Sequence, residues 1–272
     1  MPKKPPKAYK NLDFLNSAEA RALRILAEYL EPRSRFHANK VEDTIVFFGS
    51  ARMLDRETAE KRLKTITKAV EKNPSEENQR EKREAEKRLE LSQYYEDARK
   101  LSRLLTEWSM SIKNSKHRFL ITSGGGPGIM EAANRGAAEV EGGRTVGLNI
   151  SIPMEQNNNP FITEELNFEF HYFFTRKFWF VYLAKALVVF PGGFGTFDEL
   201  FEVLTLTQTG KVQKRMPVVL YGEDYWKSLI NFDALVDNLM IDRQDLDLMH
   251  FSNTPEEAFE YLRNELTAKF LT

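Results

Sequence analysis

The sequence predicts an α/β protein in which helices cover a mainly parallel sheet. Short runs of β-branched or aromatic residues alternate with segments of helical periodicity, and several of these runs lead directly into a glycine turn. In sheets of this kind, ligands bind beyond the carboxyl ends of the strands, where such turns lie. With 272 residues, 42% of them hydrophobic, the chain is long enough to form one large domain with a packed core.

Residues 1–40 predict a helical extension ahead of the sheet. The segment SAEARALRILAEYLEP has helical periodicity, and Pro32 is expected to end this helix. The basic start MPKKPPKAYK is not followed by an apolar segment, and the most apolar run of the chain is too short to span a bilayer. We therefore expect a soluble, cytoplasmic protein.

Five strands are expected, each a short apolar run. They cover residues 44–49, 118–122, 144–150, 186–190 and 217–222. The C-terminal part predicts one surface helix over residues 221–240 and a last helix with Thr254 as its N-cap, Pro255 in first position and Glu257 three residues after the cap.

Residues 55–116 form a charged insertion that predicts two amphipathic helices. Their apolar stripes consist of Ala59, Leu63, Ile66 and Val70, then Leu91, Tyr94, Ala98, Leu101, Leu105 and Trp108. Asn73 is expected to cap the second helix, with Pro74 as its first residue. Because acidic and basic residues interleave throughout, solvated helices are favoured over a basic arm for nucleic acid.

The composition excludes several kinds of site. The 39 basic and 40 acidic residues give a net charge of -1, so an anionic ligand requires a local site. The chain has no cysteine, which excludes disulfides, thiolate catalysis and cysteine-ligated zinc. The four histidines show no metal-ligand spacing, and we expect neither a metal nor another cofactor.

The first glycine cluster, SGGGPG at residues 123–128, follows a strand and is expected to open a helix at Pro127. Its backbone N–H groups can approach an anion, and the helix N-terminus adds positive potential. The spacing matches neither a P-loop nor GxGxxG, because Ile129 stands where the last glycine is needed. A phosphate site and a plain strand-to-helix turn both remain open.

The second cluster, PGGFGT at residues 191–196, repeats this layout. Two such turns in one parallel sheet can face each other across its carboxyl edge, which favours a phosphate or sugar-phosphate site. With Thr196 as N-cap, Glu199 is the third helical residue and the two form a capping box. Three preceding glycines are unnecessary for a simple cap. We therefore expect a turn that both caps a helix and presents a reactive carboxylate, kept ionised by the helix N-terminus.

The third feature is HYFFTRKFWFVYLAKA. If Thr175 caps the apolar helix that follows, Arg176 and Lys177 lie in its first turn, where the helix dipole disfavours cations and an anion should compensate. In one interpretation both side chains reach solvent or pair with nearby glutamates. In the other, Arg176 faces a bound phosphate or Glu199.

Taken together, SGGGPGIMEAANRGA, the TRK triplet and PGGFGTFDELFEVLTLTQTGK resemble the LOG family, the cytokinin riboside 5'-monophosphate phosphoribohydrolases and their bacterial nucleotide nucleosidase relatives. The resemblance covers about residues 44–52 and 117–225. It implies a Rossmann-like fold, usually a homodimer, that hydrolyses a nucleoside 5'-monophosphate to free base and ribose 5-phosphate. Family members were long labelled lysine decarboxylases, a label unsupported here, since no lysine stands in an evident pyridoxal phosphate setting.

The resemblance also implies which residues act. The catalytic pair falls on Arg176 and Glu199. The substrate contacts fall on Gly192, Gly193, Gly195 and Thr196, with Lys177, Thr205, Ser123, Gly124, Gly125, Gly126, Ser50 and Glu155 as further candidates. The N-terminal extension and the charged insertion depart from compact family members, so the base that is released stays open.

The chemistry of this reaction agrees with these residue types. Breaking an N-glycosidic bond builds positive charge at the ribose C1', which the ionised carboxylate of Glu199 can stabilise or meet with a directed water. Arg176 would orient Glu199 and hold the substrate, while the glycine turns fix the 5'-phosphate.

Two other functions compete with hydrolysis. Similar Rossmann-like proteins carry nucleotide-like ligands, including molybdenum cofactor, without cleaving them. A structural or regulatory protein could act through the charged helices instead. The presence of both Arg176 and Glu199 favours an enzyme.

Overall fold

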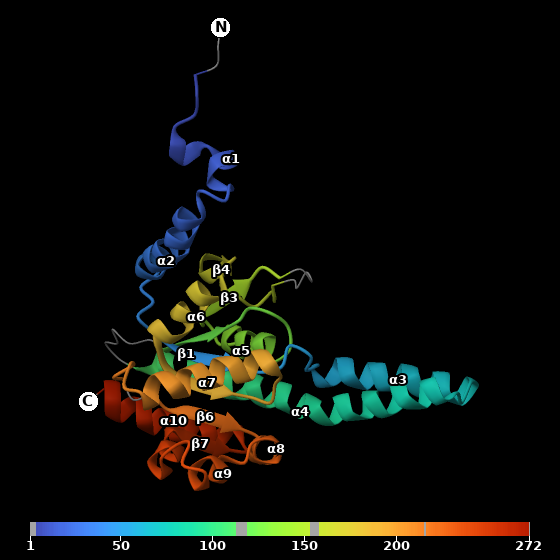
Figure 1. Cartoon of the computed structure of the whole chain (residues 1–272). Helices are drawn as coiled ribbons and strands as arrows, with labels where there is room; N and C mark the ends of the chain where they lie inside the picture. The colour runs from blue at the N-terminus through green and yellow to red at the C-terminus, as the bar shows by residue number, and fades with distance from the viewer. Residues whose placement is uncertain (1–3, 113–118, 153–157, 215, 272) are drawn as a thin grey trace.

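A seven-stranded sheet forms the centre of the molecule (Figure 1). The computed structural model describes residues 4–112, 119–152, 158–214 and 216–271. The strand order is β4-β3-β2-β1-β5-β6-β7, and every neighbouring pair is parallel. The strands are β1 (Asp43–Phe48), β2 (Phe119–Ser123), β3 (Thr145–Ile150), β4 (Asn167–Phe170), β5 (Ala184–Val189), β6 (Val218–Tyr221) and β7 (Met249–Ser252).

Helices cover both faces of this sheet, so the predicted three-layer, Rossmann-like α/β fold is confirmed. On β1, Ile45 and Phe47 pack on one face with α4 (Glu76–Ser111), α5 and α10 (Pro255–Phe270). Val46 and Phe48 pack on the other face with α2 (Arg21–Ala38), α6 and α7. The bounds of the helices beside the carboxyl edge are α5 (Ile129–Ala138), α6 (Phe173–Tyr182) and α7 (Phe194–Gln208). No helix in the described ranges is both long and apolar enough to cross a bilayer.

The two edge strands, β4 and β7, were not predicted. Each has four residues, and the 3-10 helix η2 (Glu164–Leu166) leads directly into β4. Their sequences, NFEF and MHFS, are half polar because an edge strand has one sheet neighbour and more contact with solvent. They therefore lack the continuous apolar run that marks a central parallel strand.

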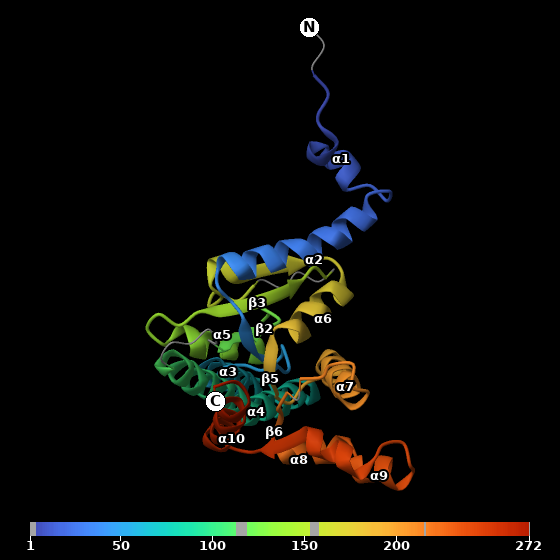
Figure 2. The same ribbon diagram turned by 90° about the vertical axis from the view of Figure 1, so that its left-hand side faces the viewer.

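The N-terminal extension contains a helix that continues through its proline. α2 spans Arg21–Ala38, so the prediction that Pro32 ends it is wrong. A proline inside a helix leaves the carbonyl four residues earlier without its helical donor. Here that carbonyl, on Glu28, accepts a hydrogen bond from Trp179 Nε1 at 3.1 Å, and Pro32 is buried. Ahead of α2, η1 (Ala8–Lys10) and α1 (Leu12–Leu15) project from the body (Figure 1, Figure 2).

The charged segment between β1 and β2 is partly a projecting arm and partly core. α3 (Arg56–Lys72) and the first half of α4 (Glu76–Ser111) extend away from the body (Figure 1). The second half of α4 packs on the sheet through Tyr95, Ala98, Leu101 and Leu105. Ser75, and not the predicted Asn73, caps α4, because its side chain accepts the Asn78 N–H at 3.2 Å.

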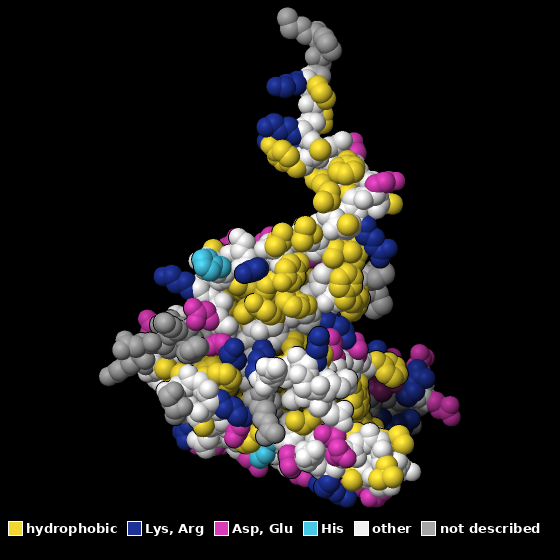
Figure 3. Space-filling model, turned by 60° about the vertical axis from the view of Figure 1, so that its left-hand side comes forward, with side chains coloured by type: hydrophobic (Ala, Val, Ile, Leu, Met, Phe, Trp, Pro, Cys, Tyr) yellow, Lys and Arg dark blue, Asp and Glu magenta, His cyan; other side chains and the backbone are white. Residues whose placement is uncertain are grey.

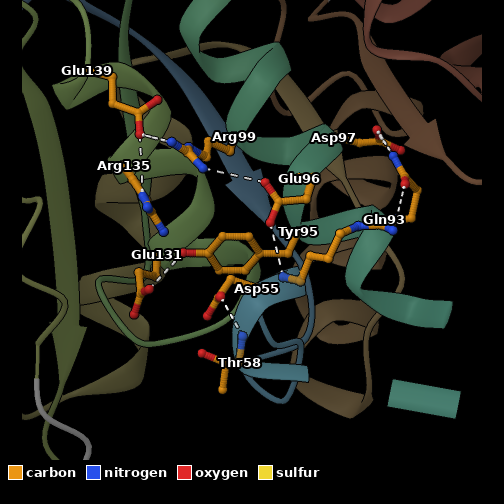
Figure 4. Close-up of polar contacts among 11 residues, drawn as sticks. Asp55, Thr58, Gln93, Tyr95, Glu96, Asp97, Arg99, Glu131, Arg135 and Glu139 are labelled. Atoms are coloured by element: carbon orange, nitrogen blue, oxygen red, sulfur yellow. Dashed lines mark hydrogen bonds and ion pairs between the residues drawn. The ribbon is translucent and has the colours of Figure 1, made fainter. Parts of the chain in front are cut away.

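A polar network fixes the base of this arm to α5 (Figure 4). The Tyr95 hydroxyl donates to Glu131 Oε1 at 2.7 Å, and Arg99 Nε donates to Glu139 Oε1 at 2.8 Å. Arg135 lies 3.4 Å from the same Glu139 oxygen. The Tyr95 hydroxyl and the Arg99 guanidinium of α4 therefore hold α4 to α5, the helix that follows the first glycine turn.

The C-terminal part differs from its prediction at one helix. Residues 221–240 contain two short helices, α8 (Glu223–Leu229) and α9 (Phe232–Asp237), followed by η3 (Arg243–Leu248). The break falls where the Asn231 side chain accepts the Ala234 N–H at 3.0 Å and starts α9 anew. α10 (Pro255–Phe270) begins as predicted, with the Thr254 hydroxyl accepting the Glu257 N–H at 3.2 Å.

Candidate functional site

A cavity of about 780 Å³ opens at the carboxyl edge of the sheet, beside the turns that follow β1, β2 and β5. Its size suits a small-molecule ligand. Its walls consist of Phe48, Gly49, Ser50, Ala51, Arg52, Gly124, Met130, Phe173, Arg176, Gly193, Phe194, Gly195, Thr196, Phe197, Asp198 and Glu199. Seven of the residues predicted for the site meet here, namely Ser50, Gly124, Arg176, Gly193, Gly195, Thr196 and Glu199.

The turn after β5 delivers the N-terminus of α7 to this cavity. α7 starts at Phe194 with Gly193 as its N-cap, so Thr196 is the third helical residue and the predicted capping box is wrong. The Gly193 carbonyl instead accepts the N–H groups of Thr196 at 2.9 Å and Phe197 at 3.1 Å. In the described part of the chain, the N–H groups of Phe194 and Gly195 have no acceptor. A ligand anion can therefore reach two free donors at a helix N-terminus.

Glu199 lies in the second turn of α7 and is 8% exposed. Burial raises the pKa of its carboxyl to about 7, although the positive charges of Lys177 and Arg176 oppose the rise. The prediction that the helix N-terminus keeps this group ionised is therefore wrong, because the dipole acts mainly within the first turn and burial outweighs it. Near neutral pH this carboxyl is poised to take up or release a proton.

Arg176 reaches the same cavity from α6. Its Nε donates to the Leu148 carbonyl at 2.7 Å, which fixes the guanidinium in a mostly buried position. A Cβ at Gly124 would lie 2.6 Å from Arg176 Nη2, so a side chain at this position would require the guanidinium to shift. Burial lowers the pKa of Arg176, and the charge of Glu199 opposes this shift. Of the two predicted interpretations, the structure supports the one in which Arg176 faces the site with Glu199.

Lys177 follows the other interpretation. Its Nζ lies 2.8 Å from both Asp198 Oδ1 and Glu202 Oε2 of α7. Burial lowers the pKa of Lys177, but these hydrogen bonds outweigh it and raise the pKa overall. Lys177 and Thr205 line a shallow neighbouring groove on α7, outside the cavity. This lysine therefore ties α6 to α7.

The predicted anion at the start of α6 comes from the N-terminal extension. The N-cap of α6 is Tyr172, so the prediction that Thr175 caps it is wrong. The Glu28 carboxylate of α2 accepts the N–H groups of His171 at 2.7 Å and Tyr172 at 3.2 Å, and lies 2.6 Å from the Thr175 hydroxyl. Because α6 starts at Phe173, Arg176 and Lys177 are its fourth and fifth residues, and Glu28 places a negative charge at the N-terminus of the helix that carries them.

The turn after β2 is mostly tied up in its own packing. α5 begins at Ile129, two residues later than predicted, with Gly128 as its N-cap. The Ser123 hydroxyl, which is buried, hydrogen-bonds Asn134 Oδ1 at 2.6 Å. The carbonyls of Gly125 and Gly126 both accept from Asn159 Nδ2 at 3.1 Å. Of this predicted set, only Gly124 lines the cavity.

Two more predicted positions lie away from the walls. The Gly192 carbonyl accepts the Tyr225 hydroxyl at 2.6 Å, and the absence of a side chain at Gly192 makes room for Thr196. Glu155 lies outside the described residues.

Several wall residues were not predicted, and four of them change the character of the site. Arg52 adds a second cation, while Met130, Phe173 and Phe194 supply apolar surface. Arg52 stands two residues after Ser50 in FFGSAR, so a search for charges beside the predicted strand end would have found it. Nothing in the sequence marks Met130, Phe173 and Phe194 as site residues, because aromatic and methionine side chains are indistinguishable there from core residues.

The fold and the cavity define a Rossmann-like protein with a ligand site at the carboxyl edge of its sheet. A family model described as "Possible lysine decarboxylase" matches residues 130–262. A probable cytokinin riboside 5'-monophosphate phosphoribohydrolase of Oryza sativa subsp. japonica is 36% identical over 81 residues, which are 29% of this chain and 32% of that protein. The chain thus matches about a third of the length of this relative. The two matches confirm the predicted resemblance to the LOG family.

A solved structure is also similar in part. The molybdenum cofactor binding protein of the phototrophic bacterium Rippkaea orientalis aligns with a TM-score of 0.44 and 22% sequence identity, over 64% of this chain and 88% of that chain.

Proposed function

We propose that the chain hydrolyses the N-glycosidic bond of a nucleoside 5'-monophosphate, such as AMP or a cytokinin riboside monophosphate, to a free base and ribose 5-phosphate. The main support is one observation: the buried Glu199 and the half-buried Arg176 line the same cavity as the free N-terminus of α7. The resemblance to the LOG family adds support for this reaction type.

The substrate phosphate binds at the start of α7 in this proposal. The unbonded N–H groups of Phe194 and Gly195 and the hydroxyl of Thr196 receive it, and Arg52 adds a positive charge. Glu199 stands four residues beyond Gly195, which is roughly 6 Å along a helix. A nucleotide held by its phosphate therefore places its ribose beside the carboxyl group.

The chemical step adds water across the bond between C1' and the base. As the bond breaks, positive charge develops at C1', and the ionised Glu199 carboxylate stabilises it and takes a proton from the attacking water. The base leaves with its bonding electron pair and takes up a proton from solvent, while Glu199 returns to solvent the proton that it took from the water. The products are the free base and ribose 5-phosphate, and the carboxylate is regenerated. Arg176, anchored through Nε, keeps its terminal nitrogens for the substrate.

Two further parts of the proposal concern the oligomeric state and the cellular location of the protein. The family resemblance supports a homodimer or a higher homo-oligomer. The cytoplasmic location remains a prediction from the sequence.

The test is base release from a panel of nucleoside 5'-monophosphates, the matched nucleosides and a cytokinin nucleotide. We expect release from monophosphates only, with Glu199→Gln lowering kcat at least about 1000-fold. Arg176→Ala should cost a similar factor. Glu202→Gln is the matched control, because this acid on the same helix pairs with Lys177, lies outside the cavity and should change kcat only a few-fold.

The panel also decides between hydrolysis and simple binding. Circular dichroism and thermal melts first establish that each variant is folded. Nucleotide binding without base release across the whole panel would sink the proposal and leave a nucleotide carrier or a molybdenum-cofactor-type binder.

A further inference from the structure

Exposed hydrophobic side chains gather on one part of the molecule. Most of the large ones in the described part of the chain belong to the N-terminal segment, α2 or α6. Figure 3 shows them along the projecting segment and over the part of the body beneath it. A patch of this kind on a protein surface marks an interaction site.

On α2 the exposed hydrophobic residues form a stripe. Leu23, Leu26 and Leu30 follow at helical spacing, and Tyr29 lies beside them. The buried residues of α2, Pro32 and Phe36, lie in its second half. The stripe is therefore extra apolar surface beyond what holds α2 to the body.

On α6 a second stripe adjoins the first. Phe174, Phe178 and Tyr182 follow at intervals of four residues, and each is at least 37% exposed. The rings of Phe178 and Tyr182 stack with centroids 5.0 Å apart, and the Tyr29 ring lies 5.2 Å from that of Phe178. These two stripes together are called the α2–α6 face.

The N-terminal segment, residues 4–16, carries apolar side chains that remain largely exposed. Tyr9 is 65% exposed and Leu12 is 69% exposed. The segment is nevertheless held in place, because Arg24 Nη1 donates to the carbonyls of Leu15 at 2.7 Å and Ser17 at 2.6 Å. It projects from the body in two perpendicular views (Figure 1, Figure 2).

We propose that the N-terminal segment of one copy docks on the α2–α6 face of a second copy, and that the exchange is reciprocal. One chain carries both an apolar face without a partner and an apolar segment that cannot fold back onto it while Arg24 directs it outward. In a dimer with a two-fold axis, the segment of each copy covers the α2–α6 face of the other, so both apolar surfaces are buried. Burying this surface is what favours association.

The exchange would also reach the active site. Phe173, the first residue of α6, lines the cavity and precedes Phe174 of the α2–α6 face. The segment of the second copy would therefore close the rim of the cavity on this side. This inference specifies the interface of the proposed homo-oligomer. Its test measures mass and not turnover, so its failure is distinguishable from failure of the proposed reaction.

Three matched substitutions in the full chain test it by sedimentation and light scattering. Leu12→Glu charges the segment, Leu26→Glu charges the face, and Leu239→Glu charges an exposed leucine outside both, on the turn after α9. We expect a dimer for the unmodified chain, a dimer dissociation constant raised about 100-fold by either of the first two changes, and no effect of the third.

The absence of cysteine allows a direct second test. A tagged Leu12→Cys chain and an untagged Tyr182→Cys chain, mixed and oxidised, should form a disulfide-linked pair of one tagged and one untagged copy. Leu239→Cys in place of Tyr182→Cys should not. A monomeric unmodified chain at micromolar concentration would overturn the proposal, as would a dimer that Leu12→Glu leaves unchanged. A monomer that binds phosphatidylserine vesicles through Leu12 would overturn it in favour of a membrane surface.

Discussion

The two glycine turns at the carboxyl edge of the sheet look alike in sequence and differ in their surroundings. After β2, Gly125 has a φ of 74° and a Cβ there would collide with the Asn149 side chain, while Asn159 holds its carbonyl. After β5, a Cβ at Gly193 or Gly195 would meet no atom within 4 Å. The first turn uses its glycines to close on the protein itself. The second leaves Gly193 and Gly195 facing an open cavity.

This difference separates two reasons for a glycine-rich turn. A positive φ and a crowded Cβ position show that the fold needs glycine. An uncrowded position beside free N–H groups shows that the space serves a ligand. Substitutions in the first turn should therefore act on stability, and those in the second on the substrate.

The largest effect is expected at Gly125. Gly125→Ala places a side chain at positive φ and against Asn149, and should lower the free energy of unfolding by about 3 kcal/mol. Urea denaturation measures this change. The matched change Gly193→Ala should alter stability by less than about 0.5 kcal/mol. Equal losses in the two variants would remove the distinction between the turns.

The next effect concerns the carboxyl group that only the second turn delivers. The folded-state pKa of Glu199 is raised from 4.5 to about 7, so the folded protein holds this proton more tightly than the unfolded chain. Stability should therefore fall as the pH rises from 4.5 to 7, and Glu199→Gln should remove on the order of 2 kcal/mol of that fall. Denaturation at pH 5 and pH 8 tests this.

The pH dependence of kcat gives the same group a second readout. Because the ionised form assists the reaction, kcat should rise with pH around a midpoint near 7. A rate that falls over this range would instead make Glu199 a proton donor.

The smallest effect is expected at Gly195. Gly195→Ala puts a methyl group into the space beside the free N–H groups of α7, so KM for a nucleoside monophosphate should rise about 10-fold. The melting temperature should hold or increase slightly, since alanine favours the first turn of a helix. Steady-state kinetics and a thermal melt on one preparation measure both. An unchanged KM would place the phosphate elsewhere.

The sequence predicted the central strands because each is a continuous apolar run buried on both faces. It did not predict β4 or β7, whose half-polar edges lack that signal. The prediction that Pro32 ends α2 was wrong for another reason. The donor that allows a helix to pass through it, Trp179, lies far away in the chain. Local propensity cannot show such a tertiary partner.

The site shows the same limit. The motifs placed Arg176 and Glu199 on elements that the fold brings to one cavity. The T-x-x-E pattern suggested a capping box, yet helix α7 starts three residues earlier, at Phe194 instead of Phe197, and leaves the carboxyl of Glu199 uncommitted. Its raised pKa follows from burial by surrounding residues, and no short motif encodes burial.

The double use of Glu28 has a consequence for how this protein can change over generations. Its carbonyl accepts a hydrogen bond from the Trp179 side chain. Its carboxylate accepts backbone N–H groups at the start of α6, the helix that carries Arg176. A shift of α2 by one turn, about 5.4 Å, would break all of these hydrogen bonds of Glu28 at once. Through Glu28, the N-terminal extension thus fixes the position of the helix that carries Arg176. Loss of the residues ahead of α2 would leave the contacts of Glu28 intact. A chain that began at β1 would lack these contacts and would need another way to position α6.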